Sequence, residues 1–216
     1  MAIEAHLVRG KFITIEGGEG AGKSTNIPNI ELFLQKRGID YVLTREPGGT
    51  KMAEEIRKLL LSPREEQVSC ITELLLMFAA RSQHLEEVIK PAVELGKYVL
   101  CDRFIVATYA YQGGGRKLNF DTIRALEGLV LSGLHPDLTI LFDIDPVIGL
   151  ERARVRGQLD RFEREELDFF ARVREAYLEI AKADPGRCAV IDGSKHQDIV
   201  AENLQNILET RLSNDT

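Results

Sequence analysis

The chain has little of what would indicate a disulfide-stabilised, metal-binding or membrane protein. Its three cysteines, Cys70, Cys101 and Cys188, are odd in number, far apart and form no C-x-x-C pair. That pattern argues against a disulfide framework and against a zinc site. The four histidines show no ligand spacing with one another or with the cysteines. No apolar run approaches the roughly 18 residues of a membrane-spanning helix, so none is expected.

Signals for export and for extensive nucleic-acid binding are also missing. Residues 1–10 include Glu4 and lack a sustained apolar core, so they do not read as a signal peptide. The 28 Lys and Arg residues against 34 Asp and Glu residues give a net charge of -6, which disfavours coating of nucleic acid. We therefore expect a cytoplasmic protein that binds neither membrane nor nucleic acid.

The composition that is present fits a globular protein with a real core. Hydrophobic residues make up 44% of the 216 residues and charged residues 29%, which are ordinary values for such a chain. No internal repeat, low-complexity stretch or long linker divides the sequence. A single domain over residues 1–216 is expected.

The most informative motif is a glycine-rich loop at residues 17–24, GGEGAGKS, which fits the pattern G-x-x-x-x-G-K-[ST]. The apolar run at 12–15 precedes it and a helical pattern follows. Glycines let successive backbone N–H groups point at one anion, and the helix N-terminus adds its partial positive charge. Lys23 can then reach the β- and γ-phosphates, and the Ser24 hydroxyl can ligate Mg²⁺. The motif therefore predicts a nucleoside-triphosphate site.

Strand-like and helical patterns alternate along the chain. The expected strands cover residues 11–16, 40–44, 97–101, 138–143 and 188–191. The expected helices cover 23–37, 51–61, 70–94, 119–132, 147–156, 166–183 and 196–212. Strands that alternate with helices favour right-handed β-α-β crossovers. We predict an α/β P-loop NTPase fold with a five-stranded, mainly parallel sheet flanked by helices.

Polar residues follow the expected strands at their carboxyl ends, where open parallel sheets bind ligands. These residues are Glu16, Glu19, Thr44, Arg45, Glu46, Asp102, Arg103, Asp143 and Asp145. Arginine forks match phosphate oxygens, and carboxylates bind Mg²⁺ or sugar hydroxyls. A second phosphate site that faces the first one is what a phosphoryl donor–acceptor enzyme needs.

A further segment, at about 151–166, is rich in arginine. A solvated helix end with surface ion pairs is one interpretation. A closing lid around Gly157 is the other, because the variable part of the phosphate loop has no arginine of its own. In that interpretation Arg154 or Arg156 brings a cation to the transferring phosphoryl group.

Taken together, these residues resemble the bacterial thymidylate kinases that carry arginines in the lid. The resemblance covers nearly the whole chain. Its motifs are residues 15–25, TREPGGT at 44–50, LMFAAR at 76–81, DRF at 102–104, AYQG at 110–113, PDL at 136–138 with Asp143, and the 152–170 lid and helix. It implies a nucleoside monophosphate kinase type of fold and a homodimer. It also implies in-line, ATP-dependent phosphorylation of dTMP to dTDP with Mg²⁺, a step of dTTP biosynthesis.

The resemblance also assigns residues to two substrates. For ATP they are Gly17, Gly18, Glu19, Gly20, Ala21, Gly22, Lys23, Ser24 and Thr25. For dTMP they are Glu19, Arg45, Pro47, Phe78, Arg81, Arg103, Thr108, Tyr111 and Gln112. The resemblance implies that Phe78 stacks on thymine, that Arg81 bonds the base, and that Thr108 and Gln112 meet its polar edge. Helix-face packing explains Phe78 as well.

The remaining implied roles concern the sugar, the acceptor phosphate and catalysis. Tyr111 and Glu19 would lie near the deoxyribose, and Arg45 and Arg103 would hold the acceptor phosphate. The metal would be bound by Ser24 and by Asp102, the latter through water. The catalytic set is Lys23, Arg103, Glu19, Arg154 and Arg156.

Some alternatives stay open at this point. Residues 105–107, IVA, are apolar where many relatives carry Asp, Thr or Ser, and the glycines at 113–115 would also suit a flexible loop. A kinase for another nucleoside monophosphate is a second interpretation, and a P-loop switch or regulatory ATPase is a third. A guanine switch would need an [NT]-K-x-D motif, which the sequence lacks.

Overall fold

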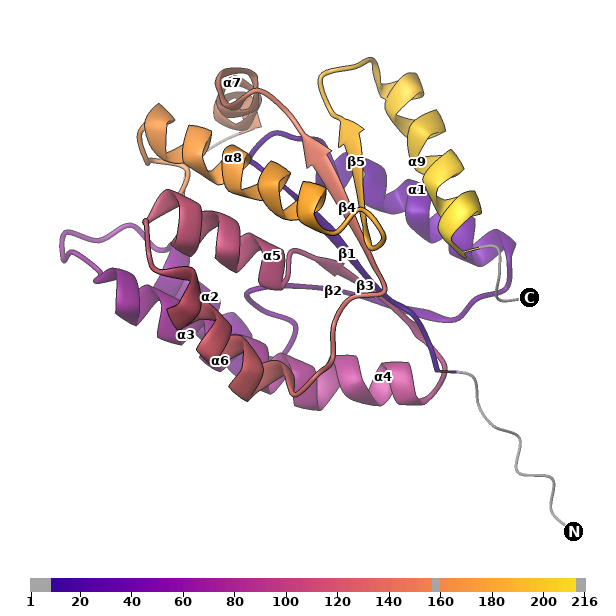
Figure 1. Cartoon of the computed structure of the whole chain (residues 1–216), viewed down its shortest axis with the longest axis horizontal. Helices are drawn as coiled ribbons and strands as arrows, with labels where there is room; N and C mark the ends of the chain where they lie inside the picture. The colour runs from indigo at the N-terminus through magenta and orange to yellow at the C-terminus, as the bar shows by residue number, and fades with distance from the viewer. Residues whose placement is uncertain (1–8, 157–159, 213–216) are drawn as a thin grey trace, which may run out of the picture.

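The computed structural model describes residues 9–156 and 160–212, and a parallel β-sheet forms their centre (Figure 1). The strand order is β2-β3-β1-β4-β5, and the four neighbouring pairs are parallel. The strands are β1 (Phe12–Gly17), β2 (Tyr41–Arg45), β3 (Tyr98–Asp102), β4 (Leu138–Asp143) and β5 (Cys188–Asp192). Both the α/β class and the five-stranded sheet predicted from the sequence are confirmed.

Helices connect the strands and cover both faces of the sheet (Figure 1). They are α1 (Lys23–Lys36), α2 (Lys51–Leu61), α3 (Cys70–His84), η1 (Leu85–Ile89), α4 (Lys90–Glu94), α5 (Ile105–Thr108), η2 (Tyr109–Gly115), α6 (Phe120–Leu131), α7 (Pro146–Arg156), α8 (Leu167–Ala183) and α9 (Gln197–Leu212). The predicted helix at 70–94 is present as α3, η1 and α4 in direct succession, η1 being a π-helical turn. The α5–η2 helix had not been predicted.

The central strand β1 is buried along its whole length because helices pack on both of its faces. Ile13 and Ile15 point into a core shared with α1 and α9, whereas Phe12 points into a second core shared with α3, α4 and α6. This explains why β1 reads as continuously apolar and not as alternating. The polar side chain of Thr14 shares a 2.9 Å hydrogen bond with Thr139 of β4.

A third core joins η2 to α8 and explains the glycines at 113–115. A Cβ atom added to Gly114 would lie 2.7 Å from the Cβ of Ala176 and 2.8 Å from the Arg172 carbonyl oxygen, both on α8. A Cβ on Gly115 would lie 2.4 Å from the Phe169 ring. These glycines therefore permit close helix packing, so the flexible-loop alternative is wrong.

The sheet order places a crevice beside β1. In the sheet, β1 lies between β3 and β4, and the chain continues from β1 to strands on either side of it. In an open α/β sheet, ligands bind at the carboxyl end of a strand in this position. The glycine-rich loop follows β1 at this edge and leads into α1. Among the helices of the described segments, none has the length and apolarity that crossing a membrane requires.

Candidate active site

The glycine-rich loop begins at the end of β1 and closes on its own lysine. Gly20 (φ 65) and Gly22 (φ 93) adopt left-handed backbone conformations, and Gly22 precedes the first residue of α1. The buried Lys23 Nζ donates to the carbonyl oxygens of Gly17 (2.9 Å) and Gly18 (2.8 Å). Burial, together with the positive charge of Arg103, lowers the pKa of Lys23 to about 8. The amine is thus poised beside the loop that was predicted to bind phosphate.

A cavity of about 700 Å³ opens from this loop along the carboxyl edge of the sheet. It brings together most of the residues expected from the sequence, although they come from distant parts of the chain. The expected residues that line it are Glu19, Gly20, Ala21, Gly22, Lys23, Ser24, Thr25, Arg45, Pro47, Arg81, Asp102, Arg103, Thr108, Tyr111 and Gln112. Gly17 and Gly18 contribute to the site through the carbonyl groups that hold Lys23.

Arg103 lines the cavity and has a backbone conformation that few arginines adopt (φ 68). Its guanidinium donates to the Gly17 carbonyl at 2.9 Å and to Glu19 at 2.7 Å. Tyr111 donates its hydroxyl to the same Glu19 oxygen at 2.8 Å. The expected trio of Glu19, Arg103 and Tyr111 is therefore assembled, and each member fixes the orientation of another.

The buried carboxylate of Glu16 is linked to this trio through Tyr177. Glu16 accepts hydrogen bonds from the Phe104 backbone N–H (2.8 Å) and from the Tyr177 hydroxyl (2.9 Å). The Tyr177 hydroxyl in turn accepts from Arg103 at 3.2 Å. Complete burial raises the pKa of Glu16 to about 6, against the opposing effect of Arg103. Glu16, which belongs to β1, contacts the site through Phe104 and Tyr177 and is not among the residues that line the cavity.

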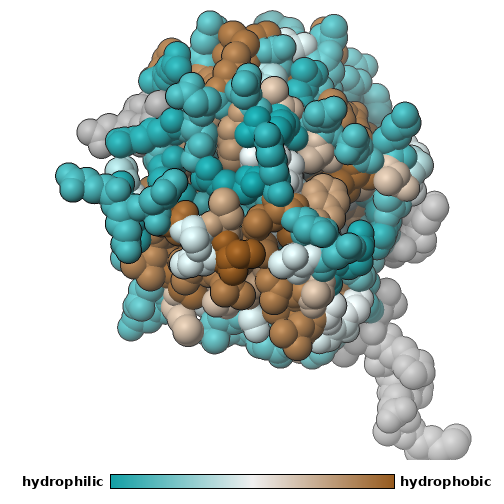
Figure 2. All heavy atoms as spheres, turned by 60° about the vertical axis from the view of Figure 1, so that its left-hand side comes forward, coloured by the Kyte–Doolittle hydropathy of each residue, from teal (hydrophilic) through white to brown (hydrophobic). Residues whose placement is uncertain are grey.

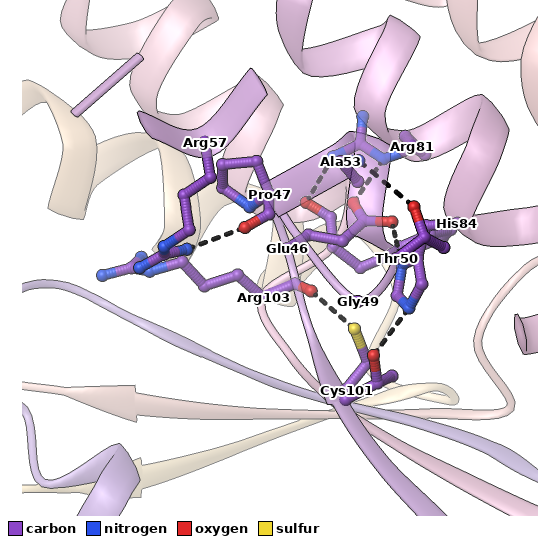
Figure 3. A network of polar contacts seen from close by, with 12 residues as sticks. Glu46, Pro47, Gly49, Thr50, Ala53, Arg57, Arg81, His84, Cys101 and Arg103 are labelled. Atoms are coloured by element: carbon purple, nitrogen blue, oxygen red, sulfur yellow. Dashed lines mark hydrogen bonds and ion pairs between the residues drawn. The ribbon is translucent and has the colours of Figure 1, made fainter. Parts of the chain in front are cut away.

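The expected arginine Arg45 reaches the cavity, but Glu54 of α2 holds its fork at 3.2 and 2.9 Å. Sequence reasoning missed Arg57, which also lines the cavity and donates to the Pro47 carbonyl at 2.8 Å. Burial and the charges of Arg45 and Arg103 lower the pKa of Arg57. In Figure 3 the side chains of Arg57 and Arg103 run to the same side of the drawn network. The available signal was that α2 starts directly after the TREPGGT motif.

Arg81 of α3 is held from behind by a buried polar network (Figure 3). Its Nε donates to Glu46 at 2.7 Å, and the other Glu46 oxygen lies 3.0 Å from Nδ1 of His84. The Nε2 of His84 lies 2.7 Å from the Thr44 hydroxyl. Nη2 of Arg81 donates to Thr108 at 2.9 Å, whereas the buried Nη1 has no partner among the described residues. An unpaired buried donor on a cavity wall indicates a place for a ligand acceptor.

The structure places Phe78 in the core, and its stacking on thymine stays a prediction. Its side chain is 3% exposed, packs in the core around Phe12 and Phe104, and is not among the cavity-lining residues. Met77, one residue earlier on α3, lines the cavity instead. Met77 lies one helical turn before Arg81 on α3 (i, i+4), and both line the cavity. The guanidinium of Arg81 lies 5.0 Å from the Phe78 ring, so Phe78 backs Arg81.

Gln112 of η2 is anchored by a buried carboxylate of α3. Its Nε2 donates to Glu73 Oε1 at 2.9 Å. Arg116 contacts both Glu73 oxygens at 3.2 Å, and Arg161 donates to Glu73 Oε2 at 2.7 Å. Arg161 also donates to the Leu60 carbonyl. The segment after residue 159 is thereby tied to α2 and α3 beside the cavity.

The arginine-rich segment places a different arginine at the cavity than expected. Arg152 of α7 lines it and donates to the carbonyl groups of Gly20 (3.4 Å) and Gly193 (3.1 Å). Arg154 is exposed and does not line the cavity, because two residues along a helix turn a side chain to the other side. The side chain of Arg156 and all of Gly157 lie outside the described residues.

The residues that could hold a magnesium ion are Asp102 and Ser24. Asp102 Oδ1 is buried and has no hydrogen-bond partner in the described part of the chain, and both residues line the cavity. One carboxylate and one hydroxyl suit a hard cation that keeps several waters and binds substrate phosphates. Asp143, by contrast, is held by Arg174 of α8 at 2.7 and 2.9 Å and is not a lining residue.

Comparison with known proteins identifies the family. The thymidylate kinase family model matches residues 15–204, which includes the end of β1, the strands β2 to β5, the glycine-rich loop and every lining residue named above. The chain belongs to the thymidylate kinase family. A thymidylate kinase of Hahella chejuensis is 55% identical over 205 residues, which cover 95% of this chain and 99% of that protein. A thymidylate kinase of Pseudomonas syringae pv. tomato is 55% identical over 203 residues, covering 94% and 97%.

The fold agrees with a solved member of the thymidylate kinase family. The crystal structure of thymidylate kinase from Ehrlichia chaffeensis superposes with a TM-score of 0.75 at 34% identity, covering 93% of this chain and 99% of that one. The P-loop fold of the nucleoside monophosphate kinase type is therefore confirmed. So is the classification as a phosphotransferase.

Proposed function

We propose that the protein transfers the γ-phosphoryl group of ATP to dTMP, giving ADP and dTDP for dTTP biosynthesis. The observation that carries the proposal is the joint arrangement in one cavity. The glycine-rich loop with Lys23 forms one part of the wall. A group of arginines, together with polar residues that can hydrogen-bond a nucleobase, forms another part. A phosphoryl donor and a phosphoryl acceptor need two such sites that face one another.

The ATP side is formed by residues 17–25 and by the loop after β5. Lys23 would meet the β- and γ-phosphates, and the N-terminus of α1 would favour their charge. Gly193, Lys195 and Gln197 line the same cavity, which makes this loop the candidate for adenine contacts. Mg²⁺, held by Ser24 and through water by Asp102, would supply neutralisation of the phosphate charge.

The acceptor side has three parts. Arg45, Arg57 and Arg103 would hold the phosphate of dTMP, because clustered guanidinium groups suit its oxygens. Glu19 and Tyr111, joined by their 2.8 Å hydrogen bond, would lie at the deoxyribose. The base would meet the donors and acceptors of Arg81, Thr108 and Gln112, with Pro47 and Met77 supplying apolar contact.

Transfer itself needs positioning and charge more than covalent help from the protein. An acceptor phosphate oxygen of dTMP forms a bond to Pγ while the bond from Pγ to the β–γ bridging oxygen breaks, and the electron pair leaves with ADP. Lys23, Arg103 and Arg152 are the described cations that would hold these oxygens in line. Arg154 and Arg156 stay predictions for a lid at about 151–166 within one domain.

An acceptor panel tests the proposal. ADP formation is measured with ATP and Mg²⁺ against dTMP, dUMP, UMP, CMP, AMP and GMP. We expect turnover of about 1–100 s⁻¹ with dTMP, as for other kinases, and a strong preference for it. Equal turnover with another monophosphate would keep the reaction class but overturn the substrate, and ATP hydrolysis indifferent to every acceptor would support a regulatory ATPase.

We further propose that the protein acts as a homodimer through the face formed by α2, α3 and α6. The predicted 70–94 helix is buried on one side by the core, yet Ile71 and Leu75 of α3 are 47% and 51% exposed. Leu59 of α2 and Leu129 of α6 are also exposed, at 52% and 74%. Figure 2, which turns this side forward, shows hydrophobic side chains gathered on it. Such a patch is typical of a protein–protein interface.

A further inference from the structure

The side-chain amide of Gln112 carries a donor on one end and an acceptor on the other, and the end that faces the cavity decides which base edge it reads. The Nε2 end is turned to Glu73. Within the described residues, no hydrogen-bond partner is recorded for Oε1, and Gln112 lines the cavity while being 1% exposed. The orientation of this amide therefore depends on what Glu73 is able to accept.

The Glu73 carboxylate acts only as a hydrogen-bond acceptor. Its side chain is 1% exposed, and its two oxygens receive Gln112, Arg116 and Arg161. An ionised carboxylate only accepts hydrogen bonds, and two guanidinium groups compensate its buried charge. If the Gln112 amide turned over, two acceptor oxygens would face each other out of water, which costs more than a lost hydrogen bond.

Arg81 fixes the other half of the pattern. Glu46 and Thr108 hold its guanidinium, and its buried Nη1 offers hydrogens that no described residue accepts. Thr108 and Gln112 are separated by one helical turn, so the Arg81 donor and the Gln112 amide belong to the same wall of the cavity. A guanidinium is always a donor. This wall thus presents a fixed donor beside an amide whose polarity Glu73 sets.

We propose that Glu73 is a positioning residue that keeps the Gln112 Oε1 atom turned toward the base. It thereby selects a pyrimidine whose edge presents a carbonyl next to a ring N–H. A thymine ring presents a carbonyl acceptor next to a ring N–H donor, which matches Arg81 and Gln112 Oε1. A cytosine ring presents an amino donor next to a ring nitrogen acceptor, which matches neither. This inference rests on the proposed function, since it assumes that the cavity holds the base of dTMP.

The test compares dTMP with 5-methyl-dCMP, which differ in that edge and share the methyl group. In Glu73→Gln the new amide offers a donor to Gln112, so Gln112 can turn over and donate to the cytosine ring nitrogen. We expect the ratio of kcat/KM for dTMP to that for 5-methyl-dCMP to fall by about tenfold or more, with KM for ATP nearly unchanged. The wild-type ratio should be large, because wrongly paired buried polar groups are strongly disfavoured.

The matched control is Glu165→Gln. Glu165 also binds Arg116, at 2.6 Å, so this variant removes the same charge from the same cluster without touching Gln112. Its ratio should equal that of the wild type. An unchanged ratio in Glu73→Gln, or an equal fall in Glu165→Gln, overturns the inference while leaving the proposed function intact. A wild-type enzyme inactive on dTMP would defeat the proposed function itself.

A second variant keeps the test decisive should Glu73→Gln not fold. Gln112→Glu places an acceptor-only side chain against Glu73, so kcat/KM for dTMP should fall by about tenfold or more while KM for ATP changes little. Wild-type activity on dTMP in Gln112→Glu would show that Glu73 does not require a donor at position 112, and would overturn the inference.

Discussion

Individual side chains in this cavity are held by neighbours whose chemistry permits one orientation. Lys23 is held by the carbonyl oxygens of Gly17 and Gly18, Arg103 by Glu19 and by the same Gly17 carbonyl, and Arg81 by Glu46. Such prior positioning lowers the free-energy cost of organising charge around a transferring phosphoryl group. Lys23 and Arg57, which also lines the cavity, allow direct tests.

The lowered pKa of Lys23 predicts a pH dependence. In the free enzyme the amine is charged below pH about 8 and neutral above it, and only the charged form attracts phosphate. We expect kcat/KM for ATP to decline with a single-proton slope as pH rises through about 8, since this parameter reports the free enzyme. Lys23→Ala should lower kcat/KM by orders of magnitude and lack this inflection. A flat wild-type profile from pH 7 to about 9.5 would contradict the assignment.

Arg57 is expected to bind the acceptor phosphate together with Arg103. Removal of a charge-assisted hydrogen bond costs about 1.5–3 kcal/mol, so Arg57→Ala should raise KM for dTMP about 10- to 100-fold and leave KM for ATP within about twofold. Arg37→Ala is the control, because the guanidinium of Arg37 lies over Phe33 on α1 and not at the cavity. Equal losses for dTMP and ATP would show that the two substrate sites are wrongly divided.

Among the elements, the α5–η2 helix has the largest influence on the site because it carries Thr108 and, about one turn later, Tyr111 and Gln112. A π-helical turn places these side chains differently from a regular α-helix, and such turns are frequent at functional sites. Gly113 packs against α6, and the position of the helix depends on how closely α8 approaches the backbone at Gly114 and Gly115. Any side chain added there must push the two helices apart.

Gly114→Ala should therefore reduce both stability and dTMP binding. Overpacking of this kind costs about 1–3 kcal/mol, which for a chain of this size lowers Tm by roughly 2–10 °C. KM for dTMP should rise because Thr108 and Gln112 move with the helix. The control is Gly128→Ala on α6, where an added Cβ meets nothing within 4 Å and alanine favours the helix. Thermal unfolding and dTMP kinetics of both variants decide the matter, and an unaffected Gly114→Ala would contradict the packing argument.

In the whole molecule, the substrate cavity and the proposed dimer surface lie on different parts of the structure. The cavity lies at the carboxyl edge of the sheet beside β1, whereas α2, α3 and α6 carry exposed apolar side chains on their outer surface (Figure 2). The helix α3 takes part in both, since Glu73 and Arg81 face inward and Ile71 and Leu75 face outward. A partner bound to the outer face of α3 would hold the helix that carries Arg81.

The proposed dimer predicts that charges on this surface separate the subunits. Leu75→Glu combined with Leu129→Glu should shift the mass in solution from a dimer to a monomer, measured by light scattering at micromolar concentration, because buried unpaired carboxylates oppose association. Leu95→Glu is the control, since Leu95 is 64% exposed but lies beyond the far end of α4. A wild-type monomer, or a dimer that survives both charges, would refute the interface.

The sequence by itself determined the fold class, the strands and the phosphate loop. These depend on local signals: apolar runs of strand length, helical periodicity, and a spacing of glycines and lysine that only a backbone anion cradle requires. Phe78 shows where such signals end. The sequence pattern of an aromatic residue on an apolar helix face is the same whether the side chain contacts a ligand or packs in the core. Only the tertiary structure shows that Phe78 is buried in the cluster that includes Phe12 and Phe104.

The tertiary structure alone decided which charges meet. The local sequence around Arg57, Arg152 and Glu73 does not show which groups these side chains meet, because a guanidinium or carboxylate gains its role from groups far away in the sequence. Glu73 receives Gln112, 39 residues on, and Arg161, 88 residues on. Burial then turns these contacts into strong constraints, since a polar group removed from water must keep its partner.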